Sequence, residues 1–184
     1  MLYWIIPVAV TVILVFFIVG IYNGLVRRRK EVDNAWAQID VQLKKRCDLI
    51  PNLVETVKGY AKHEKDTLEN VVMWRSKATG ATTAEDAIEA NKGLGQALGR
   101  LLVTCESYPD LKADKNFLSL QADLKEVENK IAVARQFYND TVMNYNQKRE
   151  LFPSNIVAKL FKFKAAPYFQ AEEAAREVPK VSFS

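Results

Sequence analysis

The chain has little of what most catalytic and metal-binding sites are built from. Its 184 residues include one histidine and two cysteines. Cys47 and Cys105 lack the close spacing of a zinc site, so we expect two small buried side chains in a reducing compartment. A glycine-rich phosphate loop is also missing, because GLGQALG follows no predicted strand and precedes no Lys-Ser or Lys-Thr pair. We therefore expect a protein that is not an enzyme, with no cofactor, no metal and no small-molecule substrate.

The single histidine, His63, lies in the charged run KHEKD, which is typical of a solvated helix face. A hydrolase or metal enzyme is our third hypothesis, with Asp48 and Glu55 as the partners of His63. No Glu-x-x-His pair, which a di-iron bundle would require, occurs on any predicted helix. Ordinary surface charges are the simpler interpretation of these residues.

Glycine and proline are scarce too, with seven and six residues, and no stretch alternates β-branched with polar side chains. Apolar residues instead recur three, four or seven positions apart from Leu25 to Ile50 and on to Ala78, which is typical of amphipathic helices. We predict an all-α fold in which an N-terminal transmembrane helix continues into an antiparallel, coiled-coil-like bundle of long helices, three long and one short.

Pro51 lies inside the first of these helices, in KKRCDLIPNLVETVKGY. The apolar phase passes from Ile50 to Val54 without a slip, so we expect a kink within one helix rather than a reversal of the chain. Proline removes the hydrogen bond to the carbonyl of Cys47, at a cost of about 3 kcal/mol that packing must offset. The predicted kink and motif residues are Asp48, Ile50, Pro51 and Asn52.

Two turn-like stretches, residues 79–86 and 106–114, separate the remaining long helices. Thr83 with Asp86 and, later, Asp114 are the expected N-caps. Gly95 and Gly99, four residues apart, predict close packing against a neighbouring helix. A short helix is expected after Pro153, with Ser154 as its N-cap.

An uncharged run of twenty residues, YWIIPVAVTVILVFFIVGIY, precedes a cluster of basic residues. At 1.5 Å per residue it spans about 30 Å, which is the thickness of a bilayer core. A cleaved signal peptide would need basic residues before the run, a shorter run and a small-residue cleavage site, and none of these is present. The residues expected at the membrane interfaces are Trp4, Tyr22, Arg27, Arg28, Arg29 and Lys30.

The basic cluster at residues 27–30 accounts for the whole net charge of +4. A nucleic-acid-binding face would need the excess inside the folded domain, so we expect no nucleic-acid partner. Residues 1–25 are expected to form a short stub and the transmembrane helix. The positive-inside rule places the N-terminus of this segment outside the cytoplasm. Residues 26–169 then form a cytoplasmic bundle, with residues 170–184 as a mobile tail. The lipid bilayer, with anionic lipids as candidates, is the expected partner of the basic cluster.

Aromatic and amide side chains cluster in the last long helix. Phe137, Tyr138 and Tyr145 are expected in the core rather than on a base-stacking surface. The amide residues are Asn139, Asn144 and Asn146. Two roles stay open for them: they form cross-links inside the bundle, or they provide a surface for a partner protein. The lysine-rich segment KLFKFK that follows could either close the apolar end of the bundle or rest on an anionic membrane.

The order of three blocks, NAWAQIDVQLKKRCDLIPNLVETVKGYAKHE, then ESYPDLKADKNFLSLQADLKEVENKIAVARQFYNDTVMNYN, then FPSNIVAKLFKF, resembles the LemA family. The resemblance covers nearly the whole chain after the apolar run, with Cys47 where histidine or arginine is commoner. It implies a single-pass protein of the bacterial cytoplasmic (inner) membrane with a cytoplasmic helical bundle. It implies no catalytic residues, and some relatives organise bacterial membrane structures.

We therefore predict a membrane-anchored helical scaffold or assembly protein that forms a homo-oligomer or binds membrane-protein partners. The alternative is a regulatory or adaptor subunit of a membrane protease or envelope enzyme, which would bind through the amide surface.

Overall fold

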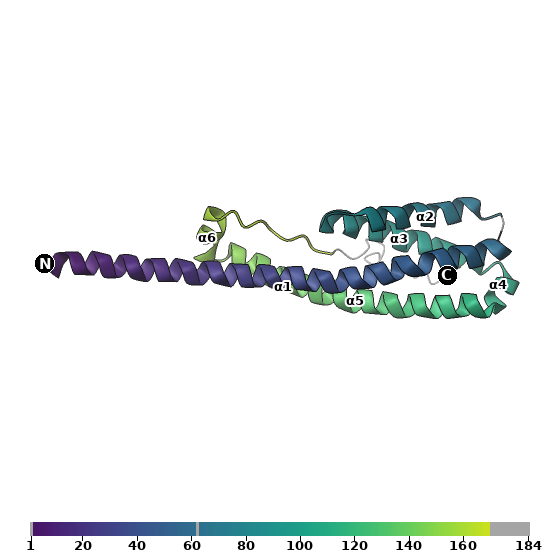
Figure 1. Cartoon of the computed structure of the whole chain (residues 1–184), viewed down its shortest axis with the longest axis horizontal. Helices are drawn as coiled ribbons and strands as arrows, with labels where there is room; N and C mark the ends of the chain where they lie inside the picture. Colours follow the sequence, from purple (N-terminus) through teal and green to yellow (C-terminus); the bar gives the residue numbers. More distant parts are fainter. Residues whose placement is uncertain (1, 62, 170–184) are drawn as a thin grey trace, which may run out of the picture. The chain divides into compact units, whose positions relative to one another are not determined.

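The computed structural model describes residues 2–61 and 63–169, and all regular structure in this part is helical. The predicted all-α class is confirmed. The helices, in chain order, are α1 (Leu2–Tyr60), α2 (Lys65–Gly80), α3 (Ala84–Cys105), α4 (Pro109–Ala113), α5 (Lys115–Glu150) and α6 (Ser154–Leu160) (Figure 1).

Helix α1 is continuous over 59 residues and passes through Pro51 without interruption, so the chain does not reverse there. The first break comes at residues 61–64, and our prediction of one helix reaching Ala78 was wrong. The connection between Tyr60 and Lys65 has four residues, which is close to one helical turn of 3.6 residues. The helical spacing of the apolar residues therefore continues across a real reversal of the chain. This spacing alone cannot reveal the reversal.

Two predicted N-caps are present. Thr83 accepts a hydrogen bond from the backbone N–H of Asp86 at 3.1 Å, and this begins α3. Asp114 accepts one from the N–H of Phe117 at 2.9 Å, at the start of α5. This backbone donor lowers the pKa of the Asp114 carboxyl below its usual value.

Two details of the predicted connections differ from the structure. The stretch predicted as a plain turn contains the five-residue helix α4, which Pro109 begins at a position where the missing N–H costs little. Ser154 is the first residue of α6 rather than its N-cap. Its hydroxyl donates instead to the carbonyls of Lys148 and Leu151, at 2.6 and 2.9 Å.

The described chain divides into two compact units, and both α1 and α5 contribute to each of them. Of the described residues, the first unit contains 2–38 and 136–168, and the second contains 39–61, 63–135 and 169. Residues 170–184, predicted as a mobile tail, lie outside the described residues.

In the second unit, the end of α1, then α2, α3 and the start of α5 run antiparallel in succession (Figure 1). This bundle thus contains four of these helices where we predicted three long ones, because the break between Tyr60 and Lys65 creates α2. Apolar stripes of these four helices meet in one core, as the 3-and-4 spacing predicts, and Leu111 of the short helix α4 joins them. Its most deeply buried members include Ile50, Leu53, Val57, Val71, Leu94, Leu101 and Leu111.

Close helix packing in this unit occurs at a glycine that we did not single out. A Cβ on Gly93 would lie 2.4 Å from an indole carbon of Trp74, so α2 and α3 can approach only because Gly93 has no side chain. A Cβ on Gly99, by contrast, would meet open space. The prediction of close packing at Gly99 was therefore wrong.

Candidate functional site

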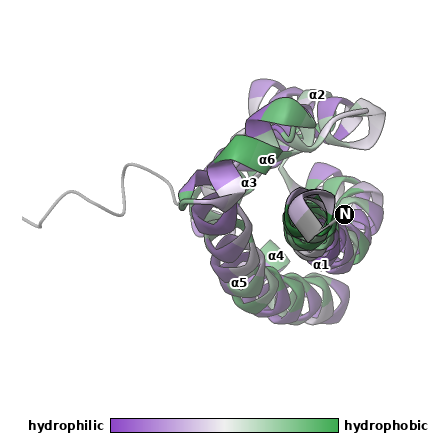
Figure 2. Cartoon of the chain, turned by 90° about the vertical axis from the view of Figure 1, so that its left-hand side faces the viewer, coloured by the Kyte–Doolittle hydropathy of each residue, from purple (hydrophilic) through white to green (hydrophobic). Residues whose placement is uncertain are grey.

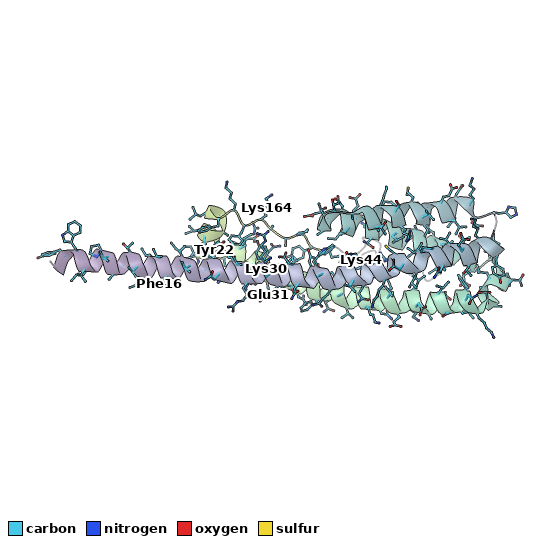
Figure 3. All side chains as sticks on the ribbon, viewed as in Figure 1. Phe16, Tyr22, Lys30, Glu31, Lys44 and Lys164 are labelled. Carbon is cyan, nitrogen blue, oxygen red and sulfur yellow. The ribbon has the colours of Figure 1, made fainter. Side chains whose placement is uncertain are left out.

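The apolar segment at the start of α1 is exposed along its length. All residues from 3 to 20 are exposed, among them Phe16 (Figure 3). This helix is long and apolar enough to cross a bilayer, and it is the one such helix among the described residues. The hydroxyl of Thr11 donates to the carbonyl of Pro7 at 2.8 Å, so it finds its partner inside the helix, as a lipid environment requires.

The residues predicted at the membrane interfaces lie at the two ends of this segment. Trp4 is exposed near one end. Tyr22, at the other end, packs against the rings of Phe161 and Phe163, with centroids 4.8 and 5.6 Å away. In the basic cluster that follows, Arg28 is half-buried, whereas Arg27, Arg29 and Lys30 are exposed.

The amide residues of α5 lie in three different environments. Asn146 is buried, and its side chain both donates to the carbonyl and accepts from the N–H of Ala166, each at 3.0 Å. It therefore cross-links the chain internally, which is one of the two roles left open. Asn139 is half-buried and Asn144 is exposed, so of the three only Asn144 lies wholly on a surface.

Two buried tyrosines of α5 hold the same extended segment. The hydroxyl of Tyr138 donates to the carbonyl of Pro167 at 2.8 Å, and that of Tyr145 donates to Lys164 at 2.7 Å. Because this segment belongs to no helix, these side chains supply hydrogen-bond partners that a helix backbone would otherwise provide. Burial raises the pKa of the Tyr145 hydroxyl, which stays a donor. Phe137, also predicted in the core, is 52% exposed, so that prediction was wrong.

At Pro51 the structure shows what replaces the missing backbone hydrogen bond. The carbonyl of Cys47 lacks its donor four residues on, and the Nε of Arg75 on α2 donates to it at 2.8 Å. A residue of the second helix thus stabilises the proline position of the first. Of the motif residues, Ile50 is fully buried, whereas the exposed ones are Asp48, Pro51 and Asn52.

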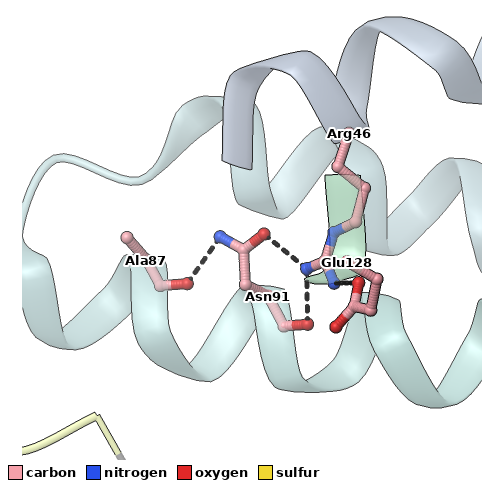
Figure 4. Close-up of polar contacts among 4 residues, drawn as sticks. All are labelled: Arg46, Ala87, Asn91 and Glu128. Atoms are coloured by element: carbon pink, nitrogen blue, oxygen red, sulfur yellow. Dashed lines mark hydrogen bonds and ion pairs between the residues drawn. The ribbon is translucent and has the colours of Figure 1, made fainter. Parts of the chain in front are cut away.

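Five residues before Pro51, a charged side chain enters the core of the second unit. Arg46 is 3% exposed, and its guanidinium donates to the carbonyl and side-chain oxygen of Asn91 on α3, at 3.0 and 2.7 Å (Figure 4). It also pairs with Glu128 of α5 at 3.0 Å. Asn91 in turn donates to the carbonyl of Ala87 at 2.8 Å. This Arg46 network therefore links α1, α3 and α5 through charge-assisted bonds.

Two open grooves lie on the second unit. One, of about 480 Å³, borders the Arg46 network and is lined by Leu98, Leu124 and Lys125 among others. The other, of about 600 Å³, lies between the end of α1 and α2, and is lined mainly by apolar side chains such as Val72 and Met73.

The residues considered for catalysis do not converge. His63 is exposed in the connection between α1 and α2, and Asp48 and Glu55 are exposed on α1. Among residues 2–61 and 63–169, no three His, Cys, Asp or Glu side chains lie close enough to hold a metal ion. Both cysteines are buried and free, and burial raises both thiol pKa values, that of Cys105 to about 11.

Comparison with known proteins agrees with these features. Residues 35–183 match the model of the LemA family. The chain belongs to the LemA family. A Protein LemA of Metamycoplasma hominis is 29% identical over 162 residues, which are 88% of this chain and 74% of that relative.

This LemA-family chain is also similar to magnetosome proteins. Magnetosome protein MamQ 2 of Paramagnetospirillum magneticum is 36% identical over 93 residues, which are 50% of this chain and 34% of that protein. Magnetosome protein MamQ of Magnetospirillum gryphiswaldense is 24% identical over 88% of this chain and 68% of its own length. The names of these relatives describe no enzymatic activity. With the apolar helix, they point to a membrane-associated helical protein.

Sequence reasoning missed the Arg46 network, although the sequence contains its signal. Arg46 is three residues after Leu43 and four before Ile50, so it lies on the buried face of α1. It is the one charged residue on this face between Ile39 and Val57. A charge on an apolar stripe needs a partner, but the sequence does not say which of the many acidic residues supplies it.

Proposed function

We propose that this LemA-family protein is a single-pass membrane-anchored helical scaffold, whose cytoplasmic bundle binds further copies of itself or partner proteins of the membrane. The observation that carries the proposal is α1. One continuous helix contains the exposed apolar segment and, at its other end, core residues of the second unit. Proteins bound to such a bundle are held close to the membrane.

The basic cluster after the apolar segment supports the orientation of this anchor. Residues 27–30 are all basic, and the positive-inside rule places them in the cytoplasm, with the N-terminus outside. The bacterial inner membrane is the membrane that this orientation and the family imply.

A surface for partners is available on α5. Phe137 and Asn144 are exposed and lie seven residues apart, so they share one face of the helix. Aromatic residues are enriched at protein interfaces. The predicted amide surface is thus revised to Phe137 with Asn144.

Photo-crosslinking in native membranes tests the proposal. We would place p-benzoylphenylalanine at Phe137, and at Met143 as a control, because Met143 is equally exposed on another face of α5. The scaffold proposal predicts adducts from position 137 that contain a second copy or several membrane proteins. A monomeric mass in detergent together with no adduct would contradict it.

The alternative, a regulatory or adaptor subunit of a membrane protease or envelope enzyme, rests on the same exposed pair. It predicts that the photo-crosslinker at position 137 captures one enzyme in fixed stoichiometry and no second copy of the chain. Replacing Asn144 by alanine should then weaken that capture, whereas a self-assembling scaffold would still form its adducts with itself.

A further inference from the structure

Helix α6 has two apolar faces, and the described chain covers only one of them. Val157 and Ala158 are buried, and they pack against Leu25 of α1. Ile156 and Leu160, one turn apart on another face, are 59% and 69% exposed. A helix that is apolar on both faces normally has both covered, so the face with Ile156 and Leu160 lacks an occupant.

This uncovered face lies at the depth where the apolar segment of α1 ends. Phe161 and Phe163, which follow α6, contact Tyr22, and Val157 contacts the helix one turn later at Leu25. Figures 1 and 3 show α6 beside this part of α1, with Tyr22 between the apolar segment and Lys30. Viewed from the N-terminal end, the α6 ribbon includes hydrophobic positions (Figure 2). Phe152, just before α6, is also apolar and 79% exposed.

The sequence around this surface is basic. Residues 151–169 contain Lys159, Lys162 and Lys164 and no acidic residue. None of the ion pairs found in the described part of the chain involves these three lysines. Apolar side chains beside uncompensated lysines are the pattern of helices that bind anionic lipid surfaces.

The backbone at Lys162 supports a use for its charge. After α6 the N–H of Phe163 donates to Ala158 at 2.9 Å and the N–H of Lys162 donates to Lys159 at 3.2 Å, which is the Schellman pattern. Lys162 has the left-handed φ of 56° that this pattern requires. Glycine adopts that conformation without strain, yet the position holds a lysine.

We propose that residues 151–163 form an interfacial wedge, which inserts Phe152, Ile156 and Leu160 into the headgroup region of an anionic phospholipid leaflet. The leaflet is the one that α1 leaves at Tyr22, so the wedge rests on the proposed membrane anchor. Two elements would then hold the protein to the bilayer, and the wedge would restrict how the first unit tilts about α1. Lys159, Lys162 and Lys164 contact the phosphate groups around the inserted side chains.

Spin-label accessibility in the full-length protein tests the wedge. Cysteine variants Ile156→Cys, Leu14→Cys and Val103→Cys are labelled and reconstituted in vesicles of phosphatidylcholine with phosphatidylglycerol. The native cysteines are buried, so the unmodified chain is the labelling blank. We expect the labels at positions 14 and 156 to be relaxed more by oxygen than by a water-soluble nickel chelate. The label at position 103, which is exposed on α3, should show the reverse.

The three positions separate failure of the wedge from failure of the anchor. If position 156 behaves as position 103 while position 14 stays in lipid, the wedge is refuted and the anchor stands. If position 156 is shielded from both reagents, a second copy or a partner protein covers α6, and the lipid proposal is refuted. If position 14 is reached by the nickel chelate, the anchor itself fails.

Lysine variants test the electrostatic part in the same vesicles. Lys162→Gly relieves the backbone strain, so it should keep or raise thermal stability while lowering the ratio of inserted to free wedge about fivefold. Lys164→Gln should have a similar effect on insertion, and Lys44→Gln, at an exposed lysine of α1 in the second unit, should have none. Omitting phosphatidylglycerol should reproduce the effect of both variants. Unchanged insertion in both would contradict the proposal.

Discussion

The buried guanidinium of Arg46 should make the stability of the second unit depend on a coupled network. Arg46 has one carboxylate partner, Glu128, and two acceptor oxygens on Asn91. Removing one partner of a buried charge leaves that charge uncompensated, whereas removing the whole network can be nearly neutral. We therefore expect single substitutions to destabilise the bundle and a matched double substitution to restore much of the loss.

The magnitude follows from burial and distance. At about 4 Å between charge centres, a pair is worth about 4 kcal/mol at a surface-like dielectric and about 1 kcal/mol in water. The Glu128 side chain is 52% exposed, so solvent screens the pair. For Glu128→Gln we therefore expect the free energy of unfolding to fall by about 2 kcal/mol. Arg46→Met leaves the buried side chain of Asn91 without its donor and should cost about 1–3 kcal/mol.

The decisive variant is Arg46→Met with Asn91→Leu. It removes the charge and its buried acceptor together. We expect its free energy of unfolding to lie within about 1 kcal/mol of the wild-type value. Chemical unfolding of the full chain in mild detergent, followed by circular dichroism and tryptophan fluorescence, measures each free energy. Strictly additive losses from Arg46→Met and Asn91→Leu would show that these two side chains are not coupled and would refute the reasoning. Lys44→Met, at an exposed lysine two residues earlier on α1, is the matched control and should change little.

Three further predictions concern the second unit. Gly93→Ala places a methyl group against the indole ring and should lower stability relative to Gly99→Ala by about 1–3 kcal/mol, although both gain helix propensity; equal thermal shifts would contradict the close approach. Arg75→Met should destabilise the chain by about 1–2 kcal/mol, and by less in a Pro51→Ala background, where the restored N–H supplies the donor; a double-mutant cycle measures the difference. Burial raises the pKa of Cys105 to about 11, so alkylation of its thiol in the native chain should stay slow until the pH approaches that value. Because the unfolded chain loses this proton near its ordinary pKa of about 9 and the native chain retains it, the free energy of unfolding should fall between these pH values, and less in Cys105→Ala.

Sequence periodicity was sufficient wherever one helix buries one face. It predicted the helical class, the long α5 and the caps at Thr83 and Asp114, because 3-and-4 spacing and capping chemistry are local properties. It also predicted that α1 continues through Pro51. The reversal at residues 61–64 was missed because a connection of nearly one helical turn leaves the spacing unchanged.

The candidate surfaces depended on contacts that periodicity does not contain. Asn146 and Asn144 differ by two residues, yet one binds a backbone segment twenty residues away and the other lies on the surface. Phe137 and Tyr138 are neighbours with opposite environments. Such differences depend on which segment covers each face, and this is a property of the packed chain.

The sequence by itself determined the apolar segment, its basic border, the helical pattern and the family, because each is written in the order and spacing of residue types. Only the tertiary structure decided that Arg75 satisfies the carbonyl left free by Pro51, and that Asn91 and Glu128 surround Arg46. It also placed Phe161 against Tyr22 and the covered face of α6 against Leu25. These partners come from distant parts of the chain, and their choice depends on burial and geometry that no local pattern encodes.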